Sequence, residues 1–148
     1  MDIIDVALRL IVAAMIGVAL GLNRDLHGKP TGVRTLGVVA LGAATVVLGV
    51  GRGVGADTSR VVQGIVTGIG FIGAGVIVRS DKPEVVHGLT TAACVWLTAC
   101  GGAVCGVADW SVILLGAPLV VLVLTFGGSL EQTLHRRWPP RPTTDAGR

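Results

Sequence analysis

The chain alternates long apolar runs with short polar connectors. Five runs have about the length that an α-helix needs to cross a bilayer core: residues 3–22, 35–50, 61–78, 88–106 and 112–128. The connectors contain glycine and proline, as in Gly28-Lys29-Pro30, which interrupt helices. This pattern predicts an all-α fold, a polytopic membrane bundle of about five transmembrane helices.

The composition excludes most soluble functions. Of 148 residues, 51% are hydrophobic and 14% charged, whereas a soluble domain carries roughly a quarter charged residues. The net charge is +3, but the arginines are scattered between apolar runs, so we expect no nucleic-acid partner. The segment 68–73 matches G-x-G-x-x-G, yet it lies inside a membrane-length run without a βαβ pattern. No Walker A motif, hydrolase triad or metal-binding cysteine spacing occurs, so we predict no enzyme, cofactor or metal centre.

The distribution of lysine and arginine predicts the orientation, because cytoplasmic connectors hold an excess of both. With the N-terminus outside and the C-terminus inside, Arg52 and Arg60 lie on the outer side and Arg9 within the first run. We therefore expect an N-out, C-in arrangement. The other nine cations then lie inside: Arg24, Lys29, Arg34, Arg79, Lys82, Arg136, Arg137, Arg141 and Arg148.

Two regions of different composition divide the chain. Residues 1–128 contain the apolar runs and are expected to form the transmembrane domain. The first run lacks the basic start of a signal peptide, so we expect it to be retained as a helix. Residues 129–148 contain Arg136, Arg137 and several prolines, and we expect a basic, proline-containing cytoplasmic tail.

The third run, 61–78, has two unlike halves when it is placed on a helix at 100° per residue. One half is small or polar, and the other carries branched aliphatic side chains. Because helices in lipid associate through small residues, we expect the small half to face protein and the branched half to face lipid or an outer helix. The small half consists of two adjoining stripes, Gln63, Thr67, Gly70 and Ala74 on one and Gly64, Gly68, Phe71 and Gly75 on the other.

Acidic residues in or near the runs are few. Asp57 and Arg60 stand three apart before the third run and are expected to pair across one helical turn. Mg²⁺ prefers octahedral oxygen ligands that include one or two carboxylates, but the runs offer Asp5 near one end and Asp57 near another. One copy of the chain is therefore a poor Mg²⁺ site, and conduction of Mg²⁺ would need a homo-oligomer.

Three segments, in this order and at these spacings, resemble the MgtC/SapB family of bacterial inner-membrane proteins. The resemblance covers about residues 5–128 and is to a short form, without the soluble C-terminal domain of longer members. The family commonly has Glu where Asn23 stands and Ser where Cys94 stands, so roles tied to those side chains are not carried over. The segments are Gly21-Leu22-Asn23-Arg24 with Lys29-Pro30-Thr31-Gly32-Val33-Arg34-Thr35, then 68–75, then Gly88-Leu89-Thr90-Thr91-Ala92-Ala93 with Trp96.

The resemblance implies a multi-pass protein linked to magnesium homeostasis and, in pathogens, to intracellular survival through inhibition of the F-type ATP synthase. We interpret the chain as a regulator in the lipid bilayer that acts through helix contacts with such a membrane partner. Two alternatives stay open: the small residues only pack a monomer or homo-oligomer, or a homo-oligomer transports Mg²⁺. Candidate functional or partner-contact residues are Arg24, Lys29, Arg34, Thr35, Asp57, Arg60, Gly68, Gly70, Gly73, Gly75, Thr90, Thr91 and Trp96.

Overall fold

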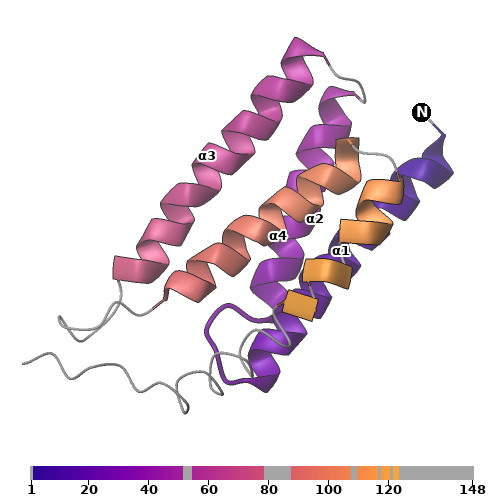
Figure 1. Cartoon of the computed structure of the whole chain (residues 1–148). Coiled ribbons are helices and arrows are strands. Elements are labelled where there is room, and N and C mark those ends of the chain that lie inside the picture. Colours follow the sequence, from indigo (N-terminus) through magenta and orange to yellow (C-terminus); the bar gives the residue numbers. More distant parts are fainter. Residues whose placement is uncertain are drawn as a thin grey trace, which may run out of the picture.

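The fold is a bundle of long apolar helices. The computed structural model describes residues 2–51, 55–78, 88–107, 110–116, 118–120 and 122–123. Four helices follow one another along the chain: α1 (Ile3–Leu26), α2 (Val33–Val50), α3 (Ala56–Val78) and α4 (Leu89–Val107) (Figure 1). Each is long and apolar enough to cross a membrane, and a shorter apolar helix, Trp110–Val120, follows α4. The predicted all-α membrane bundle is confirmed.

The ends of α1 are set by capping groups. The Asp2 carboxylate accepts a hydrogen bond from the backbone N–H of Ile4 at 3.5 Å. After the helix, Gly28 adopts φ +61°, and the N–H of Lys29 donates to the carbonyl oxygen of Arg24 at 3.0 Å. α1 thus continues four residues beyond the predicted run 3–22, because the Arg24 side chain is buried against the bundle rather than solvated.

α3 begins earlier than its apolar run predicts. The run starts at residue 61, whereas the helix starts at Ala56 and includes a polar first turn. Asp57 lies in that turn, where a negative charge is stabilised by the positive end of the helix dipole. The hydroxyl of Thr58 donates to the carbonyl oxygen of Gly51 at 3.2 Å and ties this turn to the end of α2.

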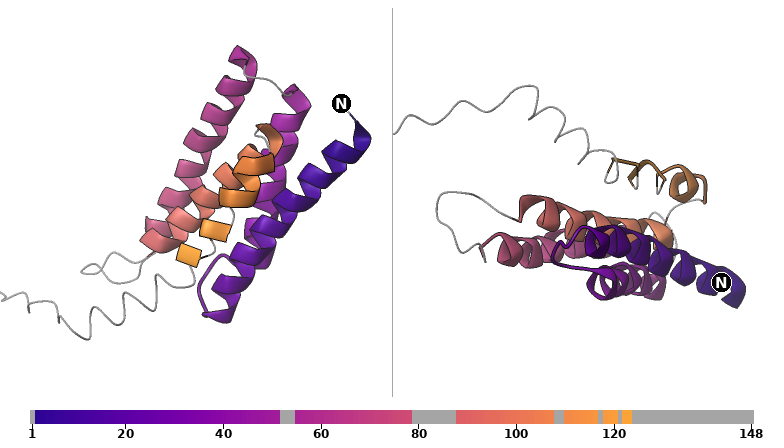
Figure 2. Two further views of the ribbon diagram at one scale, coloured as in Figure 1. Left: turned by 45° about the vertical axis from the view of Figure 1, so that its right-hand side comes forward. Right: turned by 90° about the horizontal axis from the view of Figure 1, so that it is seen from below.

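α4 lies at the centre of the bundle. It packs against α1, α2 and α3, whereas α1 and α3 do not touch one another in the described part of the chain. α2 packs extensively against α1 and α4 and only slightly against α3. The right-hand view in Figure 2 shows the short fifth helix on the side of the bundle opposite to α2. α3 is therefore an edge helix that is held chiefly by α4.

Glycines allow the backbones of α1, α2 and α4 to approach closely. A Cβ atom added to Gly17 of α1 would stand 2.5 Å from the carbonyl oxygen of Leu36 in α2. One added to Gly102 of α4 would overlap the carbonyl group of Ala40. Such close approach lets van der Waals contacts hold helices together in lipid. Two apolar clusters fill the remaining space, one formed by Leu20, Leu36, Ile69, Val95 and Ala99 and the other by Ala13, Ala44, Cys105 and Ile113.

α3 turns its branched half, not its small half, toward the other helices. Ile69 is 8% exposed and lies with Ile65 in the first cluster. Phe71 is 85% exposed, and a Cβ atom added to Gly68 would meet no atom within 4 Å. The expectation that the small half faces protein was wrong within this chain. The physical reason is that α2 and α4 present alanines such as Ala99 here, and branched side chains fill the space beside alanines better than glycines do.

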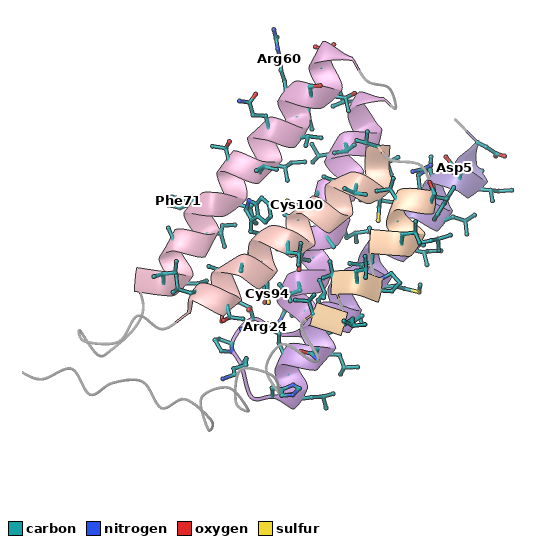
Figure 3. All side chains as sticks on the ribbon, viewed as in Figure 1. Asp5, Arg24, Arg60, Phe71, Cys94 and Cys100 are labelled. Atoms are coloured by element: carbon teal, nitrogen blue, oxygen red, sulfur yellow. The ribbon has the colours of Figure 1, made fainter. Side chains whose placement is uncertain are left out.

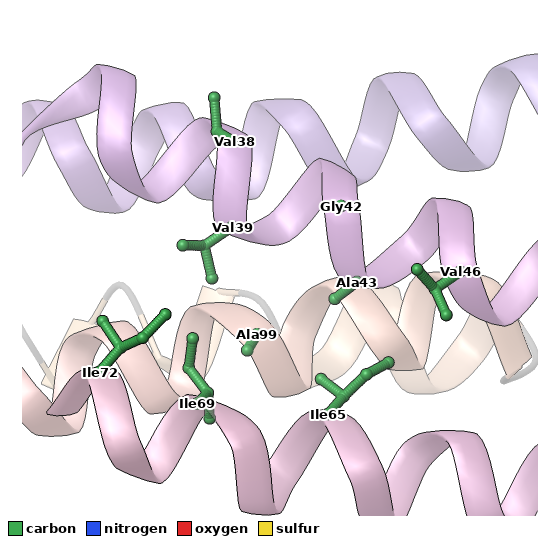
Figure 4. Close-up of a pocket in the computed structure, with 9 residues that line it drawn as sticks. All are labelled: Val38, Val39, Gly42, Ala43, Val46, Ile65, Ile69, Ile72 and Ala99. Carbon is green, nitrogen blue, oxygen red and sulfur yellow. The ribbon is translucent and has the colours of Figure 1, made fainter.

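An apolar groove separates α2 from α3. It has a volume of about 260 Å³, and Figure 4 shows valines of α2 and isoleucines of α3 along its two sides, with Ala99 of α4 between them. The groove explains why α2 and α3 touch so little, and it leaves the α3–α4 contact to fix the position of α3.

Some predictions concern parts of the chain outside the described residues. These are the tail 129–148, the end of the fifth run, the outer cation Arg52 and the inner cations Arg79 and Lys82. The division at residue 128 and the N-out, C-in orientation therefore stay predictions. The connector between α1 and α2 carries Lys29, at the end of the bundle opposite to Arg60 near the start of α3 (Figure 3).

Candidate functional site

Arg24 is a buried cation at the end of α1, with 5% of its surface exposed. Its guanidinium donates from Nε and from Nη2 to the carbonyl oxygen of Pro30, each at 3.0 Å. Nη2 also donates to the hydroxyl of Thr91, and Nη1 lies 3.4 Å from the sulfur of Cys94; both residues belong to α4. Figure 3 shows Arg24 and Cys94 together at one end of the bundle. One side chain thus joins α1, the following connector and α4.

The described groups that contact the Arg24 guanidinium are all uncharged. They are a carbonyl oxygen, a hydroxyl and a thiol, provided by Pro30, Thr91 and Cys94. Removing a charged group from water is costly unless hydrogen bonds replace those to water. Arginine suits this place because its planar guanidinium carries five donors in fixed directions, which a lysine ammonium does not.

The connector between α1 and α2 is fixed by further contacts. The Asp25 carboxylate accepts a hydrogen bond from the backbone N–H of Val33 at 3.0 Å. A Cβ atom added to Gly32 would overlap that carboxylate, so a larger residue there would displace the Asp25 side chain from this hydrogen bond. Thr31 adopts φ +64°, which is uncommon for a residue other than glycine. The connector that exposes Lys29 therefore has a defined backbone conformation.

A second arginine, Arg9, is buried in α1 about 22 Å from Arg24 along the helix, at 1.5 Å per residue. Its Nε lies 3.1 and 3.2 Å from the two carboxylate oxygens of Asp5, and Nη1 donates to the carbonyl oxygen of Cys105 in α4 at 2.8 Å. The guanidinium carbon is 5.1 Å from the centre of the Trp110 ring. Arg9 thus connects α1, α4 and the fifth helix.

Sequence reasoning did not select Arg9 as a candidate, although two signals were present. Asp5 and Arg9 have the i, i+4 spacing of a helical ion pair. An ionisable residue inside a membrane run is also a functional candidate by default. Cys94 was missed for another reason, since its contact with Arg24 joins positions 70 apart and leaves no local pattern. Pro30 lies close to Arg24 in sequence, but it contributes a backbone carbonyl oxygen, which no side-chain pattern indicates.

The structure brings Arg24 and Thr91 together and leaves most other candidates apart. Gly73 is buried, and a Cβ atom added there would lie 3.5 Å from the Cβ atom of Ala92 in α4. Trp96 of α4 is 44% exposed. The remaining candidates near the Arg24 end are exposed: Lys29 in the connector, Arg34 and Thr35 at the start of α2, and Thr90 at the start of α4.

The expected ion pair between Asp57 and Arg60 is not formed among the described residues. Both side chains are exposed, and Arg60 projects away from the bundle in Figure 3. An exposed pair gains little in water, which removes the drive to hold two side chains together. Within the described ranges, no three His, Cys, Asp or Glu side chains gather closely enough to hold a metal ion.

The outward surface of α3 contains two adjoining stripes. The polar stripe consists of Gln63, Thr67, Gly70 and Ala74, and all four are exposed. The side-chain amide of Gln63 has no hydrogen-bond partner in the described part of the chain. The glycine stripe consists of Gly64, Gly68, Phe71 and Gly75; a Cβ atom added to any of its three glycines would meet nothing within 4 Å.

The three segments singled out in the sequence meet at the Arg24 end of the bundle. Arg24 of the first contacts Thr91 of the third, and Gly73 of the second packs against Ala92 of the third. A family model described as the MgtC family matches residues 10–133. The chain belongs to the MgtC family. The three segments by which it resembles the MgtC family are thus joined by at least one contact each, through Arg24, Gly73 and the start of α4.

Individual relatives agree with membership of the MgtC family. The chain is 39% identical to Protein SrpB of Synechococcus elongatus over 93% of its own length and 84% of that protein. It is 38% identical to "Putative magnesium transporter YhiD" of Escherichia coli K12 and 36% identical to Protein MgtC of Salmonella typhimurium. These two matches cover 79% and 78% of the chain, and the chain spans 58% and 48% of the two relatives. No solved structure matches.

Proposed function

We propose that the chain is a non-enzymatic regulator of the bacterial inner membrane, linked to magnesium homeostasis and intracellular survival. It acts through contacts between the polar stripe of α3 and a membrane partner, and the F-type ATP synthase is the partner that the family resemblance implies. The observation that carries the proposal is Gln63, an exposed amide within a membrane-spanning helix and without a partner in the described chain.

An amide in contact with hydrocarbon is unfavourable, because lipid tails offer no hydrogen bonds. Polar side chains on membrane helices therefore hydrogen-bond across to other helices when they can. Gln63 shares its stripe with small residues that let a second backbone approach, such as Gly70 and Ala74. A partner helix would both contact these small residues and satisfy the amide.

The alternative function, transport of Mg²⁺, has less support from the bundle interior. The buried charged side chains of the described chain are the guanidinium groups of Arg9 and Arg24, which repel a dication. The Asp5 carboxylate, which lies within α1, is engaged by Arg9. A magnesium path therefore requires several copies and surfaces between them.

Affinity purification of the tagged chain from membranes tests the proposal. We expect F-type ATP synthase subunits to be recovered with the wild type and to be reduced at least about fivefold by Gln63→Leu, since one cross-helix hydrogen bond between side chains is worth about 1 kcal/mol. Thr45→Val is the matched control, because Thr45 is also exposed on a span but its hydroxyl donates to the Leu41 carbonyl oxygen of its own helix at 2.8 Å.

Two results would contradict the proposal. One is equal recovery of the partner with wild type and Gln63→Leu. The other is Mg²⁺ flux into vesicles that contain only the purified chain, which would favour the transporter.

A further inference from the structure

The glycine stripe of α3 continues toward the start of the helix with two opposite charges. Asp57 and Arg60 stand seven and four residues before Gly64, which places them on the same side of the helix at 100° per residue. Both are exposed and form no ion pair with each other in the described part of the chain. One face of α3 therefore presents an acidic group, a basic group, glycines and one large side chain.

The large side chain is Phe71, which lies between Gly68 and Gly75 on the stripe. It is 85% exposed and projects from the outer side of α3 in Figure 3. Phe71 protrudes between the gaps at Gly68 and Gly75. Such a surface packs well against a partner that places a gap opposite Phe71 and a large side chain opposite the glycines. A second copy of the same face, turned about a two-fold axis, meets this condition.

Lipid gives these glycines no role. Glycine lowers helix stability relative to alanine, and flexible acyl chains do not require a gap on a helix. A second helix does benefit, because its backbone can approach to van der Waals contact. α3 is the edge helix of the bundle and does not touch α1 in the described chain, so this face is open to another molecule.

We propose that two copies of the chain pair along the glycine stripes of their α3 helices, with Asp57 of each copy facing Arg60 of the other. Copies in one membrane share one orientation, so the two α3 helices run parallel about a two-fold axis along the membrane normal. A two-fold interface uses the same patch twice, and this patch supplies both signs of charge at the same end. The pairing uses a face beside the polar stripe and does not depend on the proposed function.

The contact between glycines is tested with the purified full chain in lipid vesicles. Two populations are labelled at their N-terminal tags with donor and acceptor dyes, and energy transfer is followed as the lipid-to-protein ratio rises. We expect Gly68→Leu to lower the association constant at least about fivefold, because a bulky side chain separates the two backbones. Gly49→Leu on α2 is the control, since Gly49 is equally open within its own chain but lies outside the proposed interface.

The charge contact is tested by mixing two single variants. Asp57→Arg alone and Arg60→Asp alone each bring like charges together across the axis, and we expect each to lower self-association about two- to fivefold. A mixture of the two variants brings opposite charges together and should restore association to the wild-type level. A pair formed within one chain cannot be restored by mixing.

Three outcomes would overturn the pairing. They are no energy transfer above random proximity for the wild type, equal losses for Gly68→Leu and Gly49→Leu, and failure of the mixed variants to associate better than either alone. Each of these outcomes is measured on the purified chain without an ATP synthase or any other partner, so none of them bears on the proposed function.

Discussion

α3 and α4 both carry closely spaced glycines, but they use them in opposite ways. A Cβ atom added to Gly102 or Gly106 of α4 would run into α2, at Ala40 and Val47 respectively. A Cβ atom added to Gly68 of α3 would meet nothing within 4 Å. Of the 18-residue apolar stretch that makes each helix a candidate membrane span, 50% is buried inside the chain in α4 and 11% in α3. Glycine spacing thus indicates that a backbone can approach, but not whether that backbone belongs to the same chain.

The difference follows from what each helix meets. α4 lies between α1, α2 and α3, and its small residues let three neighbours pack around it. α3 contacts chiefly α4, and it does so with Ile65 and Ile69. These are large side chains, so they fill the space between the helices instead of letting the two backbones approach closely. Its small residues are then left on the outer surface, where other molecules of the membrane can use them.

The largest expected effect separates the two kinds of glycine directly. Gly102→Ala should lower the free energy of unfolding by about 3 kcal/mol, the upper part of the range for overpacking, because the neighbouring atom is backbone and cannot turn away. Gly70→Ala should leave it unchanged or raise it by about 0.5 to 1 kcal/mol, since alanine favours a helix. Denaturant unfolding of monomeric protein in detergent, followed by circular dichroism, measures both. If Gly102→Ala lowered the free energy of unfolding as little as Gly70→Ala does, the α2–α4 contact would be looser than described.

The second prediction concerns Arg24, which closes the α1–α4 contact at one end. Arg24→Met removes all of its donors, which leaves the buried Thr91 hydroxyl without this partner and takes two hydrogen bonds from the Pro30 carbonyl oxygen. We expect a loss of about 1 to 3 kcal/mol in the free energy of unfolding. Lys29→Met in the same connector should change it by less than about 0.5 kcal/mol, because Lys29 is exposed. The same unfolding assay measures both variants. A similarly small loss for Arg24→Met and Lys29→Met would mean that Arg24 does not hold α1 and α4 together.

The third prediction compares two carboxylates in the first turns of α1 and α3. Asp5→Asn weakens the ion pair with buried Arg9, and we expect a loss of about 1 to 2 kcal/mol, reduced from the value for a fully buried pair because Asp5 is partly exposed. Asp57→Asn should cost about 0.3 to 1 kcal/mol through the helix dipole alone. Both variants are measured as dilute monomers without and with Mg²⁺. A magnesium-dependent stabilisation that disappears with Asp57→Asn would instead indicate a metal ligand.

The positions of the spans could be predicted from the sequence because hydropathy and length depend only on local composition. The predicted run 35–50 differs from α2 by two residues at one end and 88–106 differs from α4 by one at each end. The larger differences are polar turns, at Arg24 in α1 and at Asp57 in α3, where burial or the helix dipole stabilises residues that hydropathy excludes. At the fifth predicted span, 112–128, the described chain has a shorter apolar helix, Trp110–Val120, and the end of the run lies outside the described residues.

The candidate site could be predicted only in part. Arg24 and Thr91 were selected separately, from segments that resemble a family, but their contact depends on how α1 and α4 are placed in space. The orientation of α3 could not be predicted, because its two halves are both suitable for packing and the choice depends on the small side chains of α2 and α4. A periodic pattern thus defines the faces of a helix, while its neighbours decide which face is inside.

The smallest expected effect concerns the fifth helix, which packs against α1 beside Arg9. Trp110 lies over the Arg9 guanidinium, and a cation–π contact of this kind contributes about 0.5 to 2 kcal/mol. Trp110→Leu keeps an apolar side chain but removes the ring, so the free energy of unfolding should fall by about 0.5 to 1 kcal/mol. Trp96→Leu is the control, because Trp96 is partly exposed and no cation lies over its ring in the described chain. If Trp110→Leu has no effect while Asp5→Asn does, Arg9 is held by its hydrogen bonds alone, and the fifth helix packs on α1 through apolar contacts such as that of Ile113.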